Sequence, residues 1–174
     1  MTPTSARLVR FSFKPAAAGD AEVLAALHTS VAEHLTSVHG RGPWSTKTSA
    51  RGVLYALRTS RVFVACDGAE IVGTLRLATK KPWAIDTRYF TPCDRPLYLL
   101  AMAVRPDRQH RGVGRRCLEE AKRIAREWPA DAIRLDAYAA AAGAGQFYAR
   151  CGYTEVGRAA YRNTPLIYYE LLLA

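Results

Sequence analysis

A short stretch of glycines and basic side chains carries the strongest chemical signal in this sequence. Gly112 and Gly114 lie within Gln109-His110-Arg111-Gly112-Val113-Gly114, where an apolar run gives way to a helical pattern. Glycine lets backbone approach a ligand closely and adopt unusual dihedral angles. The first turn of a helix adds unpaired N–H groups and a positive dipole end, which favour an anion. Four more arginines flank the segment: Arg105, Arg108, Arg115 and Arg116.

The spacing of these glycines excludes two common kinds of phosphate-binding loop. A P-loop requires Gly-Lys-Ser/Thr, and the dinucleotide fingerprint requires three glycines, so the segment fits neither pattern. The alternative is a tight turn without a ligand. The helix start and the surrounding arginines favour the anion site.

Composition limits the class of protein. The chain has 174 residues, 49% hydrophobic and 23% charged, which predicts one folded domain over residues 1–174 and excludes a disordered chain. Its apolar runs are too short to cross a bilayer, and residues 1–4 do not begin a signal peptide, so we expect a cytoplasmic protein without a membrane partner. The formal charge of +10 favours anionic partners, either nucleic acid or a phosphorylated cofactor.

Cysteine and histidine spacing predicts no metal site. The sequence holds four cysteines and four histidines, and no two cysteines stand at a metal-knuckle or redox spacing. Without an export signal, free thiols are the expected state. Cys117 and Cys151 are interpreted as packed small residues rather than nucleophiles.

The elements that position the anion site follow from residue patterns. Asp67-Gly68 between β-rich runs predicts a hairpin, and the apolar segment 98–104 predicts a strand covered on both faces. Ser45 or Thr46 is expected to cap a second helix, and Pro129 to stop the helix that Gly112 opens. Strands are predicted at 8–13, 62–66, 70–77, 98–104, 133–138, 154–158 and 166–172. Helices are predicted at 20–39, 46–57, 112–128 and 143–151.

This order, β-α-α-β-β-β-α-β-α-β-β, predicts an α/β fold with a mixed sheet. A strand, a helix and a strand around Gly112 imply a parallel crossover, and hairpins before and after it imply antiparallel pairs.

At these residues the chain resembles the GNAT superfamily of acyl-CoA N-acyltransferases. The family signature Gln/Arg-x-x-Gly-x-Gly/Ala is matched in full by the segment 109–114. The second signature, Asn-x-x-Ala-x-x-x-Tyr-x-x-x-Gly-Phe, is matched by Ala144, Tyr148, Gly152 and Tyr153. Ala141 stands where asparagine is usual, which leaves one side-chain contact to the cofactor open.

The resemblance implies a cofactor, acetyl-CoA or coenzyme A, held between splayed fourth and fifth strands. Its pantetheine arm would bond the backbone of Met102, Ala103 and Val104, and an N–H near Met102 would polarise the thioester carbonyl. Tyr148 would protonate the departing thiolate. Further cofactor contacts are implied for Gln109, His110, Arg111, Gly112, Val113, Gly114, Arg115, Ala144 and Arg150.

Weaker signals concern the acceptor. Glu33 or His34 on the first helix is a candidate base, although a solvated helix residue is the more common reading. Asp136, among apolar strand neighbours, needs either a hydrogen-bond partner or a catalytic role. Trp44, Trp83 and Tyr89 lie in segments expected to surround the acceptor, the loop 40–44 and the long connection 80–96.

The predicted function is direct transfer of an acetyl group from acetyl-CoA to a primary amine of a small molecule or peptide. One alternative is a non-catalytic acyl-CoA sensor. The other is a nucleic-acid-binding protein, which lacks a recognition-helix or aromatic RNA-binding signature here. The sequence does not indicate the acceptor or the oligomeric state, and a homodimer stays open.

Overall fold

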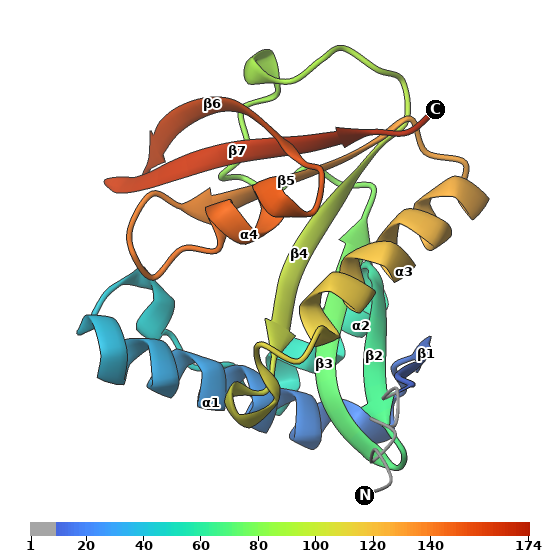
Figure 1. Cartoon of the computed structure of the whole chain (residues 1–174), viewed down its shortest axis with the longest axis vertical. Coiled ribbons are helices and arrows are strands. Elements are labelled where there is room, and N and C mark those ends of the chain that lie inside the picture. The colour runs from blue at the N-terminus through green and yellow to red at the C-terminus, as the bar shows by residue number, and fades with distance from the viewer. Residues whose placement is uncertain (1–9) are drawn as a thin grey trace, which may run out of the picture.

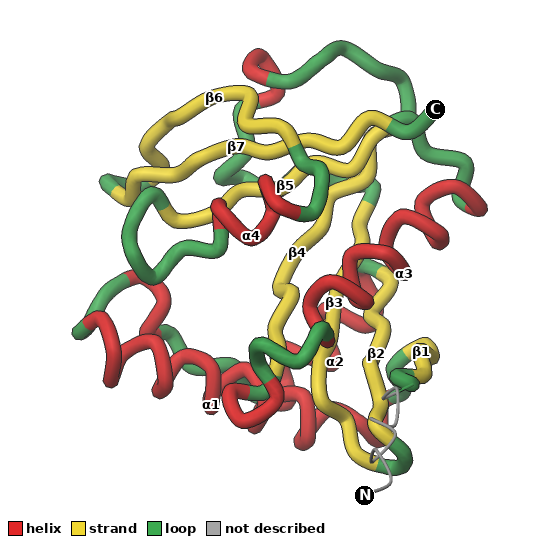
Figure 2. The backbone as a smooth tube through the Cα atoms, in the orientation of Figure 1, coloured by secondary structure: helices red, strands yellow, loops and turns green. Residues whose placement is uncertain are grey.

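The computed structural model describes residues 10–174, which form a seven-stranded sheet flanked by helices (Figures 1 and 2). The strand order is β1-β2-β3-β4-β5-β7-β6. The strands are β1 (Ser12–Pro15), β2 (Arg61–Asp67), β3 (Glu70–Ala78), β4 (Pro96–Val104), β5 (Ala132–Tyr138), β6 (Thr154–Tyr161) and β7 (Thr164–Leu172). The helices are α1 (Ala21–His39), α2 (Ala50–Thr59), α3 (Val113–Glu127) and α4 (Gly145–Arg150). The predicted α/β class and the order of elements are confirmed.

The sheet is mixed, as predicted. Strands β4 and β5 pair in parallel through the connecting helix α3, and the other strand pairs are antiparallel. The Asp67-Gly68 hairpin joins β2 to β3, with Gly68 at a φ of 60°. No helix within residues 10–174 is long and apolar enough to cross a membrane.

The predicted bounds of the first strand and of the second helix were wrong. The first strand runs from Ser12 to Pro15 rather than over 8–13. Residues 10 and 11 are not part of it, and residues 8 and 9 lie outside the described residues. The second helix is capped by Ser49, whose hydroxyl accepts the Gly52 N–H at 3.1 Å. Ser45 instead lies 2.7 Å from the Thr36 hydroxyl, because residues 43–45 form a separate 3₁₀ turn against α1.

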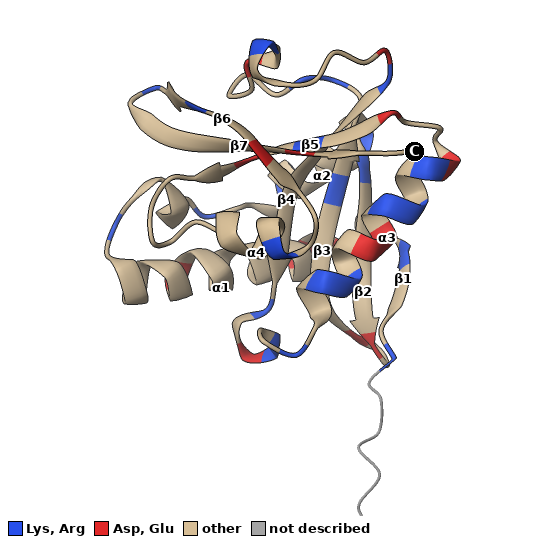
Figure 3. Cartoon of the chain, turned by 45° about the horizontal axis from the view of Figure 1, so that its top comes forward, with Lys and Arg blue, Asp and Glu red and all other residues tan. Residues whose placement is uncertain are grey.

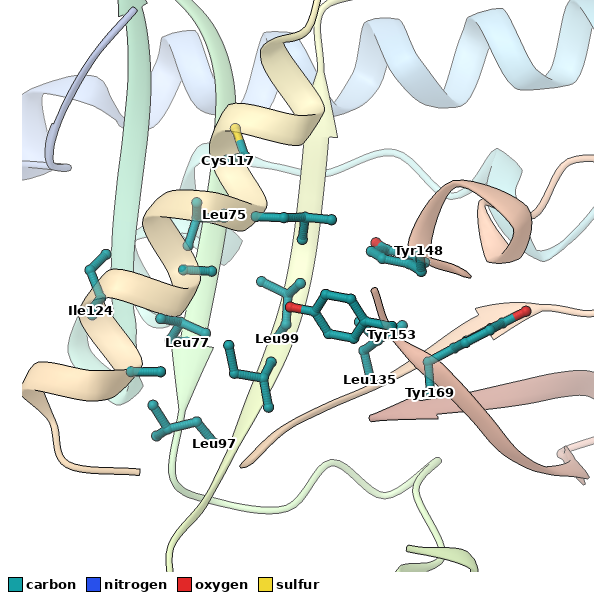
Figure 4. Packing of buried hydrophobic residues seen from close by; sticks show 14 of the residues in the cluster. Leu75, Leu77, Leu97, Leu99, Cys117, Ile124, Leu135, Tyr148, Tyr153 and Tyr169 are labelled. Atoms are coloured by element: carbon teal, nitrogen blue, oxygen red, sulfur yellow. The ribbon is translucent and has the colours of Figure 1, made fainter. Parts of the chain in front are cut away.

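Helix α3 packs its apolar stripe on one face of the sheet. The predicted stripe is buried as expected: Val113, Cys117, Leu118, Ala121, Ile124 and Ala125. Figure 4 shows leucines of β3 and β4, including Leu75, Leu77 and Leu99, between this helix and the sheet. This burial fixes the start of α3 at the end of β4.

Helices α1 and α2 cover the opposite face of β2 and β3. Leu24 of α1 and Val53 of α2 pack with Val62 and Val64, which alternate with the β2 residues facing α3. Since successive strand residues point to opposite faces, Arg76 lies on the α1–α2 face between Leu75 and Leu77.

The long connection between β3 and β4 is anchored on the C-terminal half of the sheet. Ile85 and Phe90 are buried against Tyr98 and Tyr168. Buried Glu170 accepts hydrogen bonds from the Thr91 hydroxyl and N–H, at 2.5 and 3.2 Å. The connection is therefore fixed in place and covers part of the C-terminal half of the sheet.

Truncating the core beneath α3 should destabilise the fold. Leu77 has no exposed surface, so Leu77→Ala removes buried methyl groups and leaves a cavity. We expect a loss of about 2–5 kcal/mol in the free energy of unfolding, measured by urea titration. Leu172→Ala is the control, because that side chain is 54% exposed and should change stability by only about 0.5 kcal/mol. Equal effects of the two substitutions would contradict the packing.

Candidate active site

The central feature of the site is the divergence of β4 from β5. The two strands pair only between Pro96–Tyr98 and Ala132–Arg134. From Leu99 to Val104 the edge of β4 that faces β5 has no strand partner (Figure 1). The prediction that this strand is covered on both faces is therefore right for its first half and wrong for its second, where Ala101 is exposed and Met102 only partly buried.

A β-bulge lies in the open part of β4. The register with β3 passes from Arg76↔Leu100 to Thr74↔Ala103, so β4 carries one extra residue there. Ala101 has a φ of 46°, a left-handed conformation uncommon for a residue with a Cβ. Bulges bend a strand and re-aim its groups, and this one lies where the two strands have parted.

The backbone of β4 presents hydrogen-bonding groups to the gap. The Arg105 N–H donates to the Val72 carbonyl on the β3 side at 2.9 Å. Across a trans peptide the N–H and the preceding C=O point in opposite directions, so the Val104 carbonyl faces the gap. Gln109 donates its side-chain amide to that carbonyl at 3.1 Å, which ties the following loop to the strand end. Strand alternation gives the backbone of Met102 the same orientation.

The glycine loop ends in the first turn of α3. Gly112 is the N-cap with a φ of 86°, and His110 also has a positive φ, of 59°. The first turn contains no acidic residue, and its first intrahelical bond runs from the Arg116 N–H to the Gly112 carbonyl. The preceding N–H groups lack helical partners, which makes this helix start suitable for an anion.

The sequence predicted that Gly114 lets the backbone approach a ligand, whereas in the structure it leaves space for a neighbouring side chain. A Cβ at this position would lie 3.0 Å from the ring of Phe147, so glycine allows α3 and α4 to approach closely. A Cβ at Gly112 would meet no atom within 4 Å, and its requirement for glycine is the left-handed backbone.

Ion pairs divide the basic cluster into two groups. Arg108 bonds Asp67 at 2.6 Å and Glu70 at 2.8 Å, which fixes the loop to the β2–β3 hairpin. Arg105 pairs with Asp107, and Arg116 pairs with Glu119. The remaining cations of the cluster are His110, Arg111 and Arg115. Neither these three nor Arg150 of α4 has a carboxylate partner within residues 10–174.

These unpaired cations surround the start of α3. All four are exposed, and basic segments mark α3, α4 and the loop before α3 (Figure 3). Their charge is therefore free to meet a bound phosphate group.

Tyr148 lies on α4 in an aromatic cluster. Its ring is 5.5 Å from that of Phe147 and 5.9 Å from that of Tyr153. Figure 4 shows the side chains of Tyr148, Tyr153 and Tyr169. Burial, and secondly the charge of Asp136, raise the pKa of its phenol well above the ordinary value. The phenol is therefore protonated at neutral pH. Ala144, the N-cap of α4, is exposed.

Asp136 is a carboxyl group without a cationic partner among the described residues. It lies on β5 beyond the last residue paired with β4, and it forms no salt bridge with any residue from 10 to 174. Burial raises the pKa of this carboxyl. Its charge also contributes to the raised pKa values of Tyr138, Tyr148 and Tyr168, which places it electrostatically near all three phenols.

The residues predicted to contact an acceptor are dispersed. Glu33 forms an exposed salt bridge with Lys47 at 3.2 Å, the arrangement of a solvated helix residue. Trp44 places its ring edge against Tyr138 at the end of β5, with ring centroids 5.8 Å apart. This contact joins the α1–α2 loop to the strand that carries Asp136.

The aromatic residues of the long connection lie over β6 and β7. Trp83 is 83% exposed and lines a cavity of about 300 Å³ together with Tyr161 and Tyr168. Tyr89 packs on Tyr168 and over Gly157, where a Cβ would lie 2.2 Å from its ring. These contacts pack one side of Tyr89, which is 42% exposed.

A second cavity contains polar residues that the sequence reasoning did not single out. It has a volume of about 200 Å³ and lies between α1, α2 and the bulge of β4, with His28, Arg76 and Ala101 in its lining. The available signal was an arginine inside the apolar strand 71–78 and a histidine on the apolar face of the first helix.

Comparison with known proteins identifies the family. A model of the acetyltransferase (GNAT) family matches residues 28–153, most of the chain, so the protein belongs to this family and is an acetyltransferase. The match covers the bulged strand, the glycine loop, Asp136 and Tyr148. No curated protein sequence matches the chain significantly.

Solved structures show the same fold at low sequence identity. The ribosomal-protein-alanine N-acetyltransferase of Brucella melitensis has a TM-score of 0.71 at 19% identity, over 93% of this chain and 99% of that one. The PaiA N-acetyltransferase of Thermoplasma acidophilum, solved with coenzyme A, gives 0.70 at 14% identity, over 91% and 98%. YncA of Salmonella typhimurium, solved with its cofactor acetyl-CoA, gives 0.67 at 16% identity, over 94% of both chains.

The raised pKa of Asp136 predicts how the stability of the fold changes with pH. Its raised pKa means that the folded state binds this proton more tightly than the unfolded state. Ionisation therefore destabilises the fold as pH rises above the ordinary carboxyl value near ~4. Asp136→Asn should raise the thermal unfolding midpoint at pH 7, and this gain should vanish as pH falls below ~4.

Asp131→Asn is the control of opposite sign. Arg95 lowers the pKa of Asp131, so its charge stabilises the fold above the ordinary carboxyl value and ceases to do so as pH falls through the lowered one. This variant should be less stable than the wild type at pH 7 and equal to it in strong acid. A destabilised Asp136→Asn at pH 7 would show instead that the carboxylate is favourably paired.

Proposed function

We propose that this acetyltransferase moves an acetyl group from acetyl-CoA to a primary amine of a small molecule or peptide in a direct ternary complex. The observation that carries the proposal is the unpaired edge of β4, which leads directly into the glycine loop and the start of α3. An extended chain with amide groups can bond such an edge as an added strand would. A phosphate group can bind the N–H groups that follow.

The residues present fit the pantetheine arm and the pyrophosphate of acetyl-CoA. The pantetheine amides would form hydrogen bonds with the backbone of Met102 and Val104 on the open edge of β4. Ala103 lies between these two residues in the strand. The pyrophosphate would bind the amides between His110 and Arg115. The unpaired guanidinium groups of Arg111 and Arg115 would supply the charge, with Arg150 from α4 as a further phosphate contact.

The bulge accounts for the position of the chemistry. The gap-facing N–H of Met102 follows the left-handed residue Ala101, and a fixed donor there would polarise the thioester carbonyl. The amine nitrogen then bonds to the carbonyl carbon, the carbon–sulfur bond breaks, and coenzyme A leaves as a thiolate. One proton is lost by the amine and one is gained by the thiolate, so the reaction is balanced.

Asp136 and Tyr148 suit the two proton transfers. A carboxyl with a raised pKa is a stronger base than an ordinary aspartate, and because no cation among residues 10–174 pairs with it, it is free for an amine. The charge of Asp136 is the second cause of the raised pKa of Tyr148. Once Asp136 has taken the proton of the amine, this cause disappears, and the phenol becomes a better acid when the thiolate needs a proton.

Substitution in the glycine loop tests donor binding. Gly112→Asp places a carboxylate beside the proposed pyrophosphate, and we expect affinity for coenzyme A to fall by about tenfold or more, roughly 1.4 kcal/mol, in calorimetry. Gly68→Asp is the matched control, since it puts the same side chain at another left-handed glycine with open space around it. Unchanged affinity of Gly112→Asp would remove this loop from the donor site.

Tyr148→Phe tests the assignment of the general acid. The variant should bind acetyl-CoA normally and lose about 10²–10⁴-fold in turnover, because it keeps the ring and lacks the proton. Tyr153→Phe is the control, since the Tyr153 hydroxyl is buried without a hydrogen-bond partner and its removal should cost no activity. Turnover is measured by thiol release with a saturating amine, and near-normal turnover of Tyr148→Phe would assign the proton to another group.

A further inference from the structure

The cavity between α1, α2 and the bulged strand contains a cation, Arg76, among apolar side chains and the polar residues His28, Thr48 and Thr74. Its apolar lining includes Leu24 of α1 and Val53 of α2, and Arg76 enters from β3. The cavity measures about 200 Å³, several times the ~30 Å³ that a water molecule occupies in the liquid. It therefore has room for a small organic group.

Arg76 has no partner for its charge. No carboxylate of residues 10–174 lies within salt-bridge distance, and its Nε is buried without a hydrogen-bond acceptor. Burial is also the main reason why the pKa of this guanidinium is lowered. A half-buried cation whose Nε is shielded from water without an acceptor is unfavourable, and such a group calls for a partner.

The neighbours of Arg76 do not satisfy it. Thr74, on the same face of β3, donates its hydroxyl to the Phe63 carbonyl at 2.8 Å. Burial first, and the charge of Arg76 second, lower the pKa of His28, so this imidazole is neutral at pH 7. The cavity thus holds one positive charge and no negative one among the described residues.

The cavity lies beside the residues that form the reacting end of the proposed donor site. Ala101, the left-handed residue of the bulge, lines the cavity and directly precedes Met102. A group held on Arg76 is therefore anchored behind the point where the thioester carbonyl is expected.

We infer that the cavity binds the carboxylate of an amino-acid acceptor, with Arg76 holding the carboxylate while the amine of the same molecule faces the thioester. The inference rests on the proposed function and names the class of its acceptor. A guanidinium offers two parallel N–H groups that match the oxygens of a carboxylate. A single cation beside a neutral histidine matches the one negative charge of a carboxylate better than the two of a phosphate. The small volume favours a free amino acid over a peptide.

The test compares acids with their amides. Thiol release from acetyl-CoA is measured with a panel of twenty free amino acids and the matching carboxamides, which keep the amine and lack the negative charge. The wild type should acetylate at least one acid with a KM about tenfold or more below that of its amide. Arg76→Met should raise the KM for that acid by about tenfold or more, and leave the KM for acetyl-CoA and for the amide nearly unchanged.

Two further variants separate recognition from folding. Arg126→Met removes an exposed arginine of α3 that has no ion pair among the described residues, and it should leave both KM values unchanged. Arg76→Lys keeps the charge and should restore part of the affinity for the acid. If Arg76→Met acetylates acids and amides in the wild-type ratio, or if the wild type prefers amides, the inference is overturned while the proposed function stands.

A binding measurement without turnover distinguishes failure of the carboxylate pocket from failure of the proposed acetyl transfer. The same amino acids are titrated by calorimetry into the wild type and Arg76→Met in the presence of coenzyme A. Binding that depends on Arg76 without acetyl transfer would support the carboxylate pocket and contradict the proposed transfer. Absence of binding by every acid would overturn the pocket.

Discussion

The structure depends on one constraint, the parting of two parallel strands that are paired at only one end. Backbone N–H and C=O groups are strong hydrogen-bonding groups, and those inside a sheet are normally satisfied by a neighbouring strand. On β4 they are satisfied by β5 from Pro96 to Tyr98. Beyond that point no described strand pairs with this edge, and only the Val104 carbonyl has a partner there, the Gln109 side chain. An open edge in the middle of a sheet is suited to an extended ligand. The glycine loop, the bulge and Asp136 are all placed by this divergence.

The surrounding packing holds the gap at a fixed shape. Helix α3 is anchored through its apolar stripe, so its first turn is held at the end of β4. Arg108 attaches the preceding loop to the β2–β3 hairpin, and Gln109 attaches it to Val104. On the far side, the contact of Trp44 with Tyr138 joins the α1–α2 loop to β5. The open backbone groups are therefore held in place before any ligand binds, which reduces the ordering cost of binding.

Features that depend on local sequence were predictable. The element order followed from hydrophobic period and from turn residues such as Asp67-Gly68, and the start of α3 followed from the glycines after a strand. Features that depend on long-range approach were not. Gly114 leaves space for the ring of Phe147, and Ser49 displaces Ser45 as the cap of α2 because residues 43–45 pack on α1. The cavity with Arg76 joins residues far apart in sequence, and neither Arg76 nor His28 belongs to a motif.

Amide hydrogen exchange with and without coenzyme A tests the central claim most directly, namely that the open edge of β4 and the start of α3 hold the donor. Saturating coenzyme A should slow exchange at Met102, at Val104 and in residues 112–115, where unpaired N–H groups acquire acceptors. The amides of β7, which pair with neighbouring strands on both sides, should change much less. Protection confined to other segments, with β4 and the first turn of α3 unchanged, would contradict the account.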